Sequence, residues 1–122
     1  MPADHSTARG NAAEDAALAW LEDQGLQFVT RNYRCKTGEI DLIMLDRSTL
    51  VFVEVRLRNN RNHLTGADSI THRKMRRLIR TATWYLAQHP QSRDVDYRFD
   101  VVSMGAETQW IKDAFTLDSR VD

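Results

Sequence analysis

The chain has 122 residues, of which 42% are hydrophobic and 28% are charged, and this balance is typical of one globular domain. No apolar stretch reaches the roughly 20 residues that a membrane helix needs, so we expect no membrane contact. The first residues lack the basic-then-apolar order of a secretory signal, and we therefore expect a cytoplasmic protein. Because Cys35 is the single cysteine, an internal disulfide is excluded, and no histidine pair stands with it at zinc-ligand spacing.

The formal net charge is zero, but the charges are distributed unevenly along the chain. Residues 1–25 carry five acids and one base, and residues 94–122 carry seven acids and three bases. Residues 56–80, in contrast, carry eight bases and a single acid, Asp68. A basic segment of this kind favours a partner that carries phosphates, such as a nucleic acid.

The predicted elements begin with a small, polar segment, residues 1–10, which we interpret as a flexible N-terminal tail. Residues 11–24 are helical by composition, and Gly25 ends the helix. Three strands are expected next, separated by short turns and richest in β-branched residues in the third: 26–35, 38–45 and 49–58.

A loop precedes a long amphipathic helix that is predicted from Ser69 to His89 and ended by Pro90. Residues 97–104 predict a fourth strand, and residues 109–115 are a candidate fifth. The order α-β-β-β-α-β predicts an α/β domain, with a mixed central sheet flanked by helices. We expect this single domain to span residues 11–116, with residues 117–122 as a C-terminal tail.

Two acidic side chains, Asp41 and Glu54, are predicted to lie opposite each other on the second and third strands. If the turn at residues 46–48 joins these strands as a hairpin, positions whose numbers sum to about 95 pair, and these two satisfy that rule. Paired residues lie about 5 Å apart, and like charges there need an offset, which Mg²⁺ or Mn²⁺ would supply. The other face of the third strand is expected to pack inward, and it carries Val51, Val53, Val55 and Leu57.

A third acid, Glu14, is expected to point towards the same strands. It shares a helical stripe with Ala17, Leu18 and Leu21, and a glutamate on an apolar stripe is costly to bury without a partner. The alternative is that Asn11 caps the helix and Glu14 completes a capping-box-like arrangement.

The long helix has a basic face without any acid between Thr71 and His89. Ordinary surface helices mix acids and bases four residues apart, so this face suits phosphate contacts that would weaken in salt, although a merely solvated face remains the alternative. The side chains predicted to contact nucleic acid are Arg58, Arg61, Arg73, Lys74, Arg76, Arg77 and Arg80.

Simpler alternatives exist for the strand acids as well. Asp41 and Glu54 could be solvated strand residues that form cross-strand ion pairs with Arg56 and Arg58, because charges on an exposed sheet face are common. Glu39 is a weaker candidate ligand that suits a surface position next to a turn equally well.

Several motifs together resemble one known family. GEIDLI (38–43), VFVEV (51–55), THRKMRRL (71–78) and RFDVV (98–102) closely resemble the YraN-like family of uncharacterised bacterial proteins, over roughly residues 9–115. That family in turn resembles the PD-(D/E)xK nuclease superfamily, close to Holliday-junction resolvases and tRNA-splicing-endonuclease-like domains. The resemblance implies a restriction-endonuclease-like fold.

The superfamily pattern places an acid on the first helix, an aspartate on the second core strand and an acid-x-lysine on the third. Glu14, Asp41 and Glu54 match the three acids, which implies that they bind Mg²⁺ or Mn²⁺, whereas Arg56 stands where the lysine belongs. Arginine can hold phosphate but cannot act as a base, because its pKa exceeds about 12. Lys74 could supply an amine from elsewhere.

Three hypotheses of function follow. The first is a Mg²⁺-dependent endonuclease that hydrolyses DNA or RNA, including branched structures, with Glu14, Asp41, Glu54 and Arg56 as catalytic residues. The second is a nucleic-acid-binding module on a nuclease fold without turnover, and the third is a protein-interaction domain. A homodimer is a further expectation, because two-fold symmetry suits cleavage of two strands.

Overall fold

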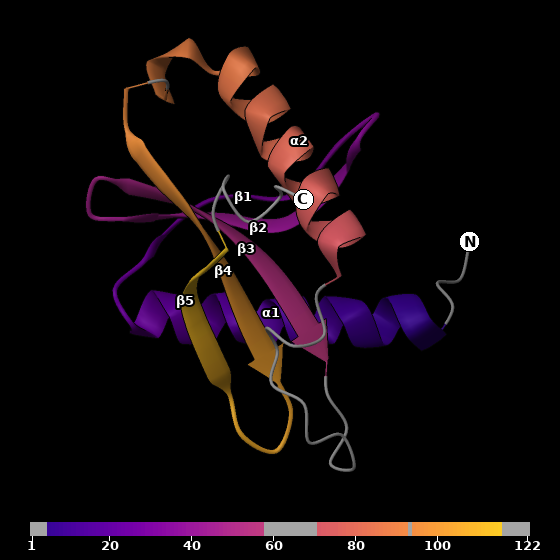
Figure 1. Ribbon diagram of the computed structural model, residues 1–122. Helices are drawn as coiled ribbons and strands as arrows, with labels where there is room; N and C mark the ends of the chain where they lie inside the picture. Colours follow the sequence, from indigo (N-terminus) through magenta and orange to yellow (C-terminus); the bar gives the residue numbers. More distant parts are fainter. Residues whose placement is uncertain (1–4, 58–70, 93, 116–122) are drawn as a thin grey trace.

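The computed structural model describes residues 5–57, 71–92 and 94–115 (Figure 1). The elements in chain order are α1 (His5–Asp23), β1 (Gln27–Cys35), β2 (Gly38–Asp46), β3 (Thr49–Leu57), α2 (His72–Gln88), the short 3-10 helix η2 (Pro90–Ser92), β4 (Asp96–Met104) and β5 (Gln109–Phe115). The α/β class and the predicted order are confirmed, and residues 109–115 do form a fifth strand. The first helix begins at His5, earlier than the sequence predicts. No helix among these residues is long and apolar enough to cross a membrane.

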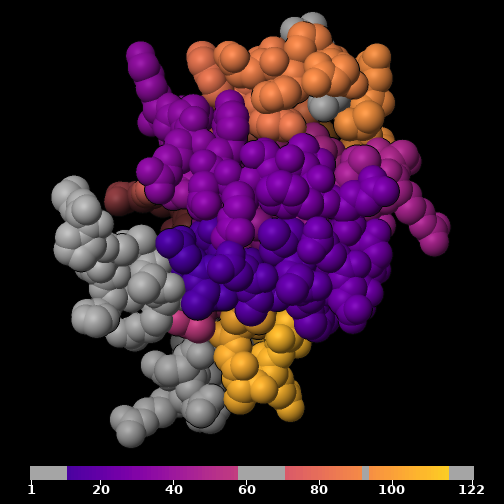
Figure 2. Space-filling view, turned by 180° about the vertical axis from the view of Figure 1, so that it is seen from behind, coloured from indigo at the N-terminus to yellow at the C-terminus, as the bar shows by residue number. Residues whose placement is uncertain are grey.

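The five strands form one mixed sheet in the order β1-β2-β3-β4-β5. Neighbouring strands are antiparallel except β3 and β4, which are parallel. A parallel pair needs a crossover connection, and α2 lies within it. In Figure 1, α1 passes behind β3 and β4 while α2 lies in front of the sheet, and the view from behind shows α1 beside the β1–β2 hairpin (Figure 2).

The register of the β2–β3 hairpin is the one that the sequence predicts. Leu42 pairs with Val53, and Ile43 pairs with Phe52, so the numbers of each pair sum to 95. The next position along each strand is occupied by Asp41 and Glu54.

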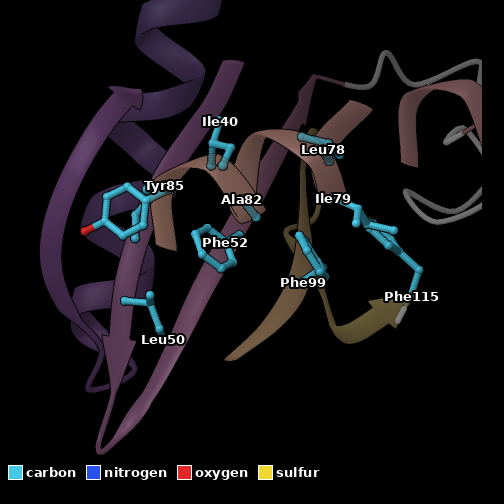
Figure 3. Close-up of a cluster of buried hydrophobic side chains, with 10 residues drawn as sticks. Ile40, Leu50, Phe52, Leu78, Ile79, Ala82, Tyr85, Phe99 and Phe115 are labelled. Atoms are coloured by element: carbon cyan, nitrogen blue, oxygen red, sulfur yellow. The ribbon is translucent and has the colours of Figure 1, made fainter. Parts of the chain in front are cut away.

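Each helix covers one face of the sheet, and alternate residues of β3 serve the two cores. Phe52 points towards α2, where its ring lies 5.9 Å from that of Tyr85 and 5.5 Å from that of Phe99 (Figure 3). Val51 and Val53 point towards α1 and are buried as predicted. The expectation of a single inward face was nevertheless incomplete, because the crossover places a helix on the second face of this central strand as well.

The last residues of β3 are no longer buried. Leu57 belongs to the face that we expected to pack inward, but its side chain is 56% exposed. The alternation of apolar residues along a strand shows which face is apolar, but it does not show how far along the strand a helix extends. The expectation for Leu57 was therefore wrong.

The middle of α2 lies close to the β1–β2 turn at Gly38. A Cβ atom added at Gly38 would lie 3.1 Å from Thr81 Oγ1 and 3.3 Å from Arg77 Cδ, and the glycine φ is +151°. At the start of the helix, the side chain of Thr71 accepts a hydrogen bond of 3.1 Å from the backbone N–H of Lys74. The turn and the cap together place the first turns of α2 over the end of the β2–β3 hairpin.

Candidate active site

Asp41 and Glu54 are neighbours in the structure, as the predicted hairpin requires. Asp41 Oδ2 accepts a hydrogen bond of 2.8 Å from the backbone N–H of Val55, and the Glu54 residue is only 7% exposed. Burial and, next to it, the charge of Glu54 raise the pKa of Asp41 to about 8, from an ordinary value of 3.8. Glu54 is therefore not a solvated strand acid, although the ion pair with Arg56 that this alternative included is present at 3.4 Å. A positive charge shared by the two carboxylates would relieve their repulsion.

Two basic side chains meet at one oxygen of Glu54. Lys74 Nζ of α2 lies 2.6 Å from Glu54 Oε2, and Arg56 Nη1 lies 3.4 Å from the same atom. Arg56 therefore stands at the site, as its place on β3 predicts. An amine is also present there, but it comes from α2 and not from the strand.

Glu14 lies next to this pair in a separate network. Arg31 Nη2 lies 3.3 Å from Glu14 Oε1, and Arg31 Nη1 lies 2.8 Å from Asp15 Oδ1. The side-chain amide of Asn32, oriented with its nitrogen towards the acids, donates to Glu14 Oε1 at 3.0 Å and to Glu39 Oε2 at 3.2 Å. Glu14 thus points towards the strands, as its helical stripe predicts.

The negative charge of Glu14 acts on the Asp41–Glu54 pair through space, and it is a further cause of the raised pKa of Asp41. In residues 5–57, 71–92 and 94–115, no three or more His, Cys, Asp or Glu side chains are arranged to hold a metal ion. The capping alternative for Glu14 is wrong, because α1 begins at His5 and Asn11 lies inside the helix.

A cleft of about 190 Å³ connects the acids to α2. Its lining comes from the β2–β3 hairpin and from the first turns of α2: Gly38, Glu39, Asp41, Glu54, Lys74, Arg77 and Leu78. Glu39 therefore lies at the cleft, but its carboxylate is paired with Arg34 at 3.3 Å. Arg77 belongs both to the cleft and to the basic face of α2.

The basic face of α2 is solvent-exposed, as predicted. Arg73, Arg76, Arg77 and Arg80 are all exposed, and within the described part of the chain none of them forms an ion pair. Lys74 is turned towards the site instead. The remaining predicted contacts, Arg58 and Arg61, lie outside the described residues.

One buried acid was missed at the sequence level. Asp100 of β4 is fully buried and accepts hydrogen bonds of 2.9 Å from Arg98 Nε, Trp110 Nε1 and the backbone N–H of Asp113. It pairs with Val53, which packs in the core next to α1, so Asp100 lies on the sheet face opposite to Glu54. The signal in the sequence was an aspartate inside an apolar run, and its role is to join β4 to β5.

Residues 13–104 match the Uncharacterised protein family UPF0102. The chain belongs to this family. A UPF0102 protein of Pseudomonas putida (strain GB-1) is 46% identical over an alignment of 121 residues that covers 94% of this chain and 98% of that protein. UPF0102 proteins of Alcanivorax borkumensis (strain SK2) and of Vibrio cholerae serotype O1 (Classical Ogawa 395) are each 45% identical, over 87% and 92% of this chain and over 90% and 95% of their own lengths. The resemblance to the YraN-like bacterial family is thus confirmed, and the matched range spans the positions of Glu14, Asp41, Glu54 and Lys74.

Proposed function

We propose that this protein binds nucleic acid and hydrolyses its phosphodiester bonds at the Asp41–Glu54 site with Mg²⁺ or Mn²⁺. The observation that supports this most strongly is that Asp41 and Glu54 line one cleft with Lys74, next to the exposed arginine face of α2. The resemblance to PD-(D/E)xK nucleases is in agreement with this arrangement. The homodimer that would suit cleavage of two strands stays a prediction.

The chemistry of the donor set supports a hard divalent cation. Mg²⁺ prefers carboxylate oxygens, and one or two carboxylates with waters and substrate phosphate are its usual ligands. Asp41 uses Oδ2 to accept from Val55, which leaves its other oxygen for a ligand, while Glu54 offers the carboxylate beside it. When bound, such a cation would polarise the phosphate and lower the pKa of a bound water. Glu14, held by Arg31, would act from the edge of the site.

In this proposal, Lys74 and Arg56 together take the roles of the lysine that the superfamily pattern places on the third strand. The Lys74 amine holds Glu54 in place and can orient a water or a phosphate oxygen, because an ammonium offers three rotatable donors. The Arg56 guanidinium contacts the scissile phosphate and stabilises the charge that develops on it. An arginine on β3 is then compatible with turnover.

A second candidate function is a nucleic-acid-binding module without turnover. It is favoured by the 2.6 Å ion pair between Lys74 and Glu54, which already offsets one of the two carboxylates. A protonated Asp41 would offset the other, because its pKa is raised to about 8. The pair could therefore be a stable structural arrangement in the absence of any metal.

Cleavage assays with full-length protein separate the two candidates. A labelled single strand, supercoiled plasmid and a four-way junction are incubated with Mg²⁺ or Mn²⁺ and with the parent protein or the variants Asp41→Ala, Glu54→Ala and Lys74→Ala. Hydrolysis predicts a loss of about 100-fold or more in each variant, the scale of removing one charge-stabilising group. Glu22→Ala, an exposed acid on α1, is the matched control and should cleave as the parent does.

If the protein binds nucleic acid in a salt-dependent way but cleaves it with neither metal, hydrolysis is overturned and the second candidate is supported. No nucleic-acid binding at all would overturn both, and would leave the protein-interaction domain. A crystal soaked in Mn²⁺ provides a direct readout, in which the proposal expects the ion at Asp41 and Glu54.

A further inference from the structure

The exposed face of α2 ends in an aromatic side chain. Arg73, Arg77, Arg80 and Trp84 are spaced i, i+4, i+7 and i+11, and such positions form one line along a helix. All four are exposed, and Trp84 is 51% exposed. The helix therefore presents a row of guanidinium groups with an indole ring at its C-terminal end.

Trp84 differs from the other two tryptophans of the chain. Trp20 and Trp110 pack edge to face with ring centroids 5.5 Å apart, beside the core under α1. Among the described residues Trp84 has no such ring partner, and the buried side of α2 is formed by other residues, such as Leu78, Ala82 and Tyr85. Its indole therefore adds little to the core and offers a flat apolar surface to solvent.

The arginine row is continuous with the cleft. Arg77 lines the cleft that contains Asp41 and Glu54, and it is also a member of the exposed row. Trp84 lies ten positions after Lys74, which is about 15 Å along a helix at a rise of about 1.5 Å per residue. A strand with one phosphate in the cleft would follow the arginines and reach Trp84 within a few nucleotides.

We propose that the α2 face is a track for single-stranded nucleic acid, with Trp84 as the platform on which an unpaired base stacks. This rests on the proposed function, and it names the substrate class of that site. Cationic side chains that follow a backbone, together with aromatic rings that stack on bases, are the combination by which proteins bind single strands. In a duplex each base is already stacked between its neighbours, so no base face is available to the indole.

The charge of the row favours a polyanion over an uncharged protein partner. The described part of α2 contains no acid, so nothing on the helix would repel successive phosphates. An acidic peptide is the other polyanion that such a face could meet, and the experiment distinguishes it from a single strand.

The experiment measures binding of full-length protein to labelled oligothymidine and oligouridine of about 20 nucleotides, longer than one single-strand site, and to a duplex of equal length. Trp84→Ala should weaken single-strand binding about 5- to 150-fold, the range for stacking of one base, while duplex binding changes less than about two-fold. The two oligonucleotides compare a DNA strand with an RNA strand, and weakening with either one supports the track.

Trp84→Phe is the companion variant. A phenyl ring still stacks, so single-strand affinity should stay close to that of the parent. Quenching of tryptophan fluorescence by the oligonucleotide should disappear, because Trp20 and Trp110 are packed against each other away from α2. Phe28→Ala removes a side chain that is 44% exposed on β1, and this matched control should change neither signal.

Equal single-strand affinity in Trp84→Ala and parent would overturn the track, as would quenching that persists in Trp84→Phe. A polyglutamate peptide is added as a competitor of the oligonucleotide. If Trp84→Ala weakens the affinity for this peptide more than the affinity for the oligonucleotide, the track is also overturned. If Trp84→Ala is neutral but Asp41→Ala abolishes cleavage, only the track fails. If Trp84→Ala weakens single-strand binding but no metal permits cleavage, the track stands and hydrolysis fails.

Discussion

At the scale of single residues, the electrostatics of the site depend on Asp41. Burial and the adjoining Glu54 raise its pKa to about 8, while in the unfolded chain its pKa returns to the ordinary value of 3.8. Between these two values the folded protein binds more protons than the unfolded chain. The free energy of unfolding therefore falls as the pH rises through this window, by at most about 1.4 kcal/mol per pH unit for one proton.

Asp41→Asn is expected to stabilise the metal-free protein at high pH. The amide oxygen can still accept from Val55, the amide nitrogen can donate to Glu54, and no proton has to be bound on folding. In the presence of a chelator, the melting temperature at pH above 8 should rise by about 4 °C or more, the shift that corresponds to about 1 kcal/mol. At pH below 4 the parent is protonated in both states and the gain should vanish.

Thermal melting at the two pH values measures this difference. The control is Glu22→Gln, an exposed acid on α1, which should leave the pH dependence of the melting temperature unchanged. A melting temperature of Asp41→Asn that is unchanged or lowered at high pH would show that the two carboxylates do not repel each other.

At the scale of elements, the contact between α2 and the β1–β2 turn holds the helix over the cleft. A Cβ atom at Gly38 would lie 3.1 Å from Thr81 Oγ1 and 3.3 Å from Arg77 Cδ. Such distances are too short for an ordinary side-chain contact, so α2 can pack this close to the turn only because position 38 has no side chain. The same contact supports the aliphatic part of Arg77, which lines the cleft.

Gly38→Ala is therefore expected to lower the free energy of unfolding and to move the start of α2. Gly25→Ala is the matched control: Gly25 also has a positive φ, of +102°, but a Cβ atom there would have no neighbour within 4 Å. Both variants suffer backbone strain of about 1–3 kcal/mol, and Gly38→Ala should lose about 1–3 kcal/mol more through overpacking. Urea unfolding of both variants compares these costs, and equal losses would argue against a tight contact with α2.

The arginine face of α2 is expected to determine the salt dependence of nucleic-acid binding. Each phosphate contact that is removed should lower the slope of log K against log salt concentration by about 0.7 to 0.9. Arg73→Gln and Arg80→Gln should each show this change in titrations at several salt concentrations. Lys112→Gln, an exposed base on β5, is the control whose slope should equal that of the parent, and equal slopes in all three would place binding elsewhere.

At the scale of the whole molecule, the mixed sheet explains why a glutamate can be buried at its centre. β3 lies between antiparallel β2 and parallel β4, and helices cover both of its faces. Glu54 is therefore removed from water although it sits near the end of the strand, and its charge needs partners beyond Arg56 of the same strand, which lies 3.4 Å away. Lys74 meets it because the crossover that contains α2 returns over that end of the sheet.

Local features of the sequence were sufficient to predict the element order and the β2–β3 register. A short turn leaves a hairpin few registers, and apolar residues at helical spacing identify the buried side of α2. For this reason the pairing of Leu42 with Val53, and with it the approach of Asp41 to Glu54, could be derived before the structure was known.

Only the tertiary structure decided which side chains complete the site. The contact of Lys74 with Glu54, the Arg31 and Asn32 contacts of Glu14, and the burial of Asp100 all join elements that are distant in sequence. Such contacts depend on where a crossover helix or an edge strand packs against the rest of the sheet. The periodic pattern of apolar residues contains no information about that position. The sequence by itself thus determined two acids side by side in a β-hairpin, whereas the packing of α2 decided that an amine from a helix meets them.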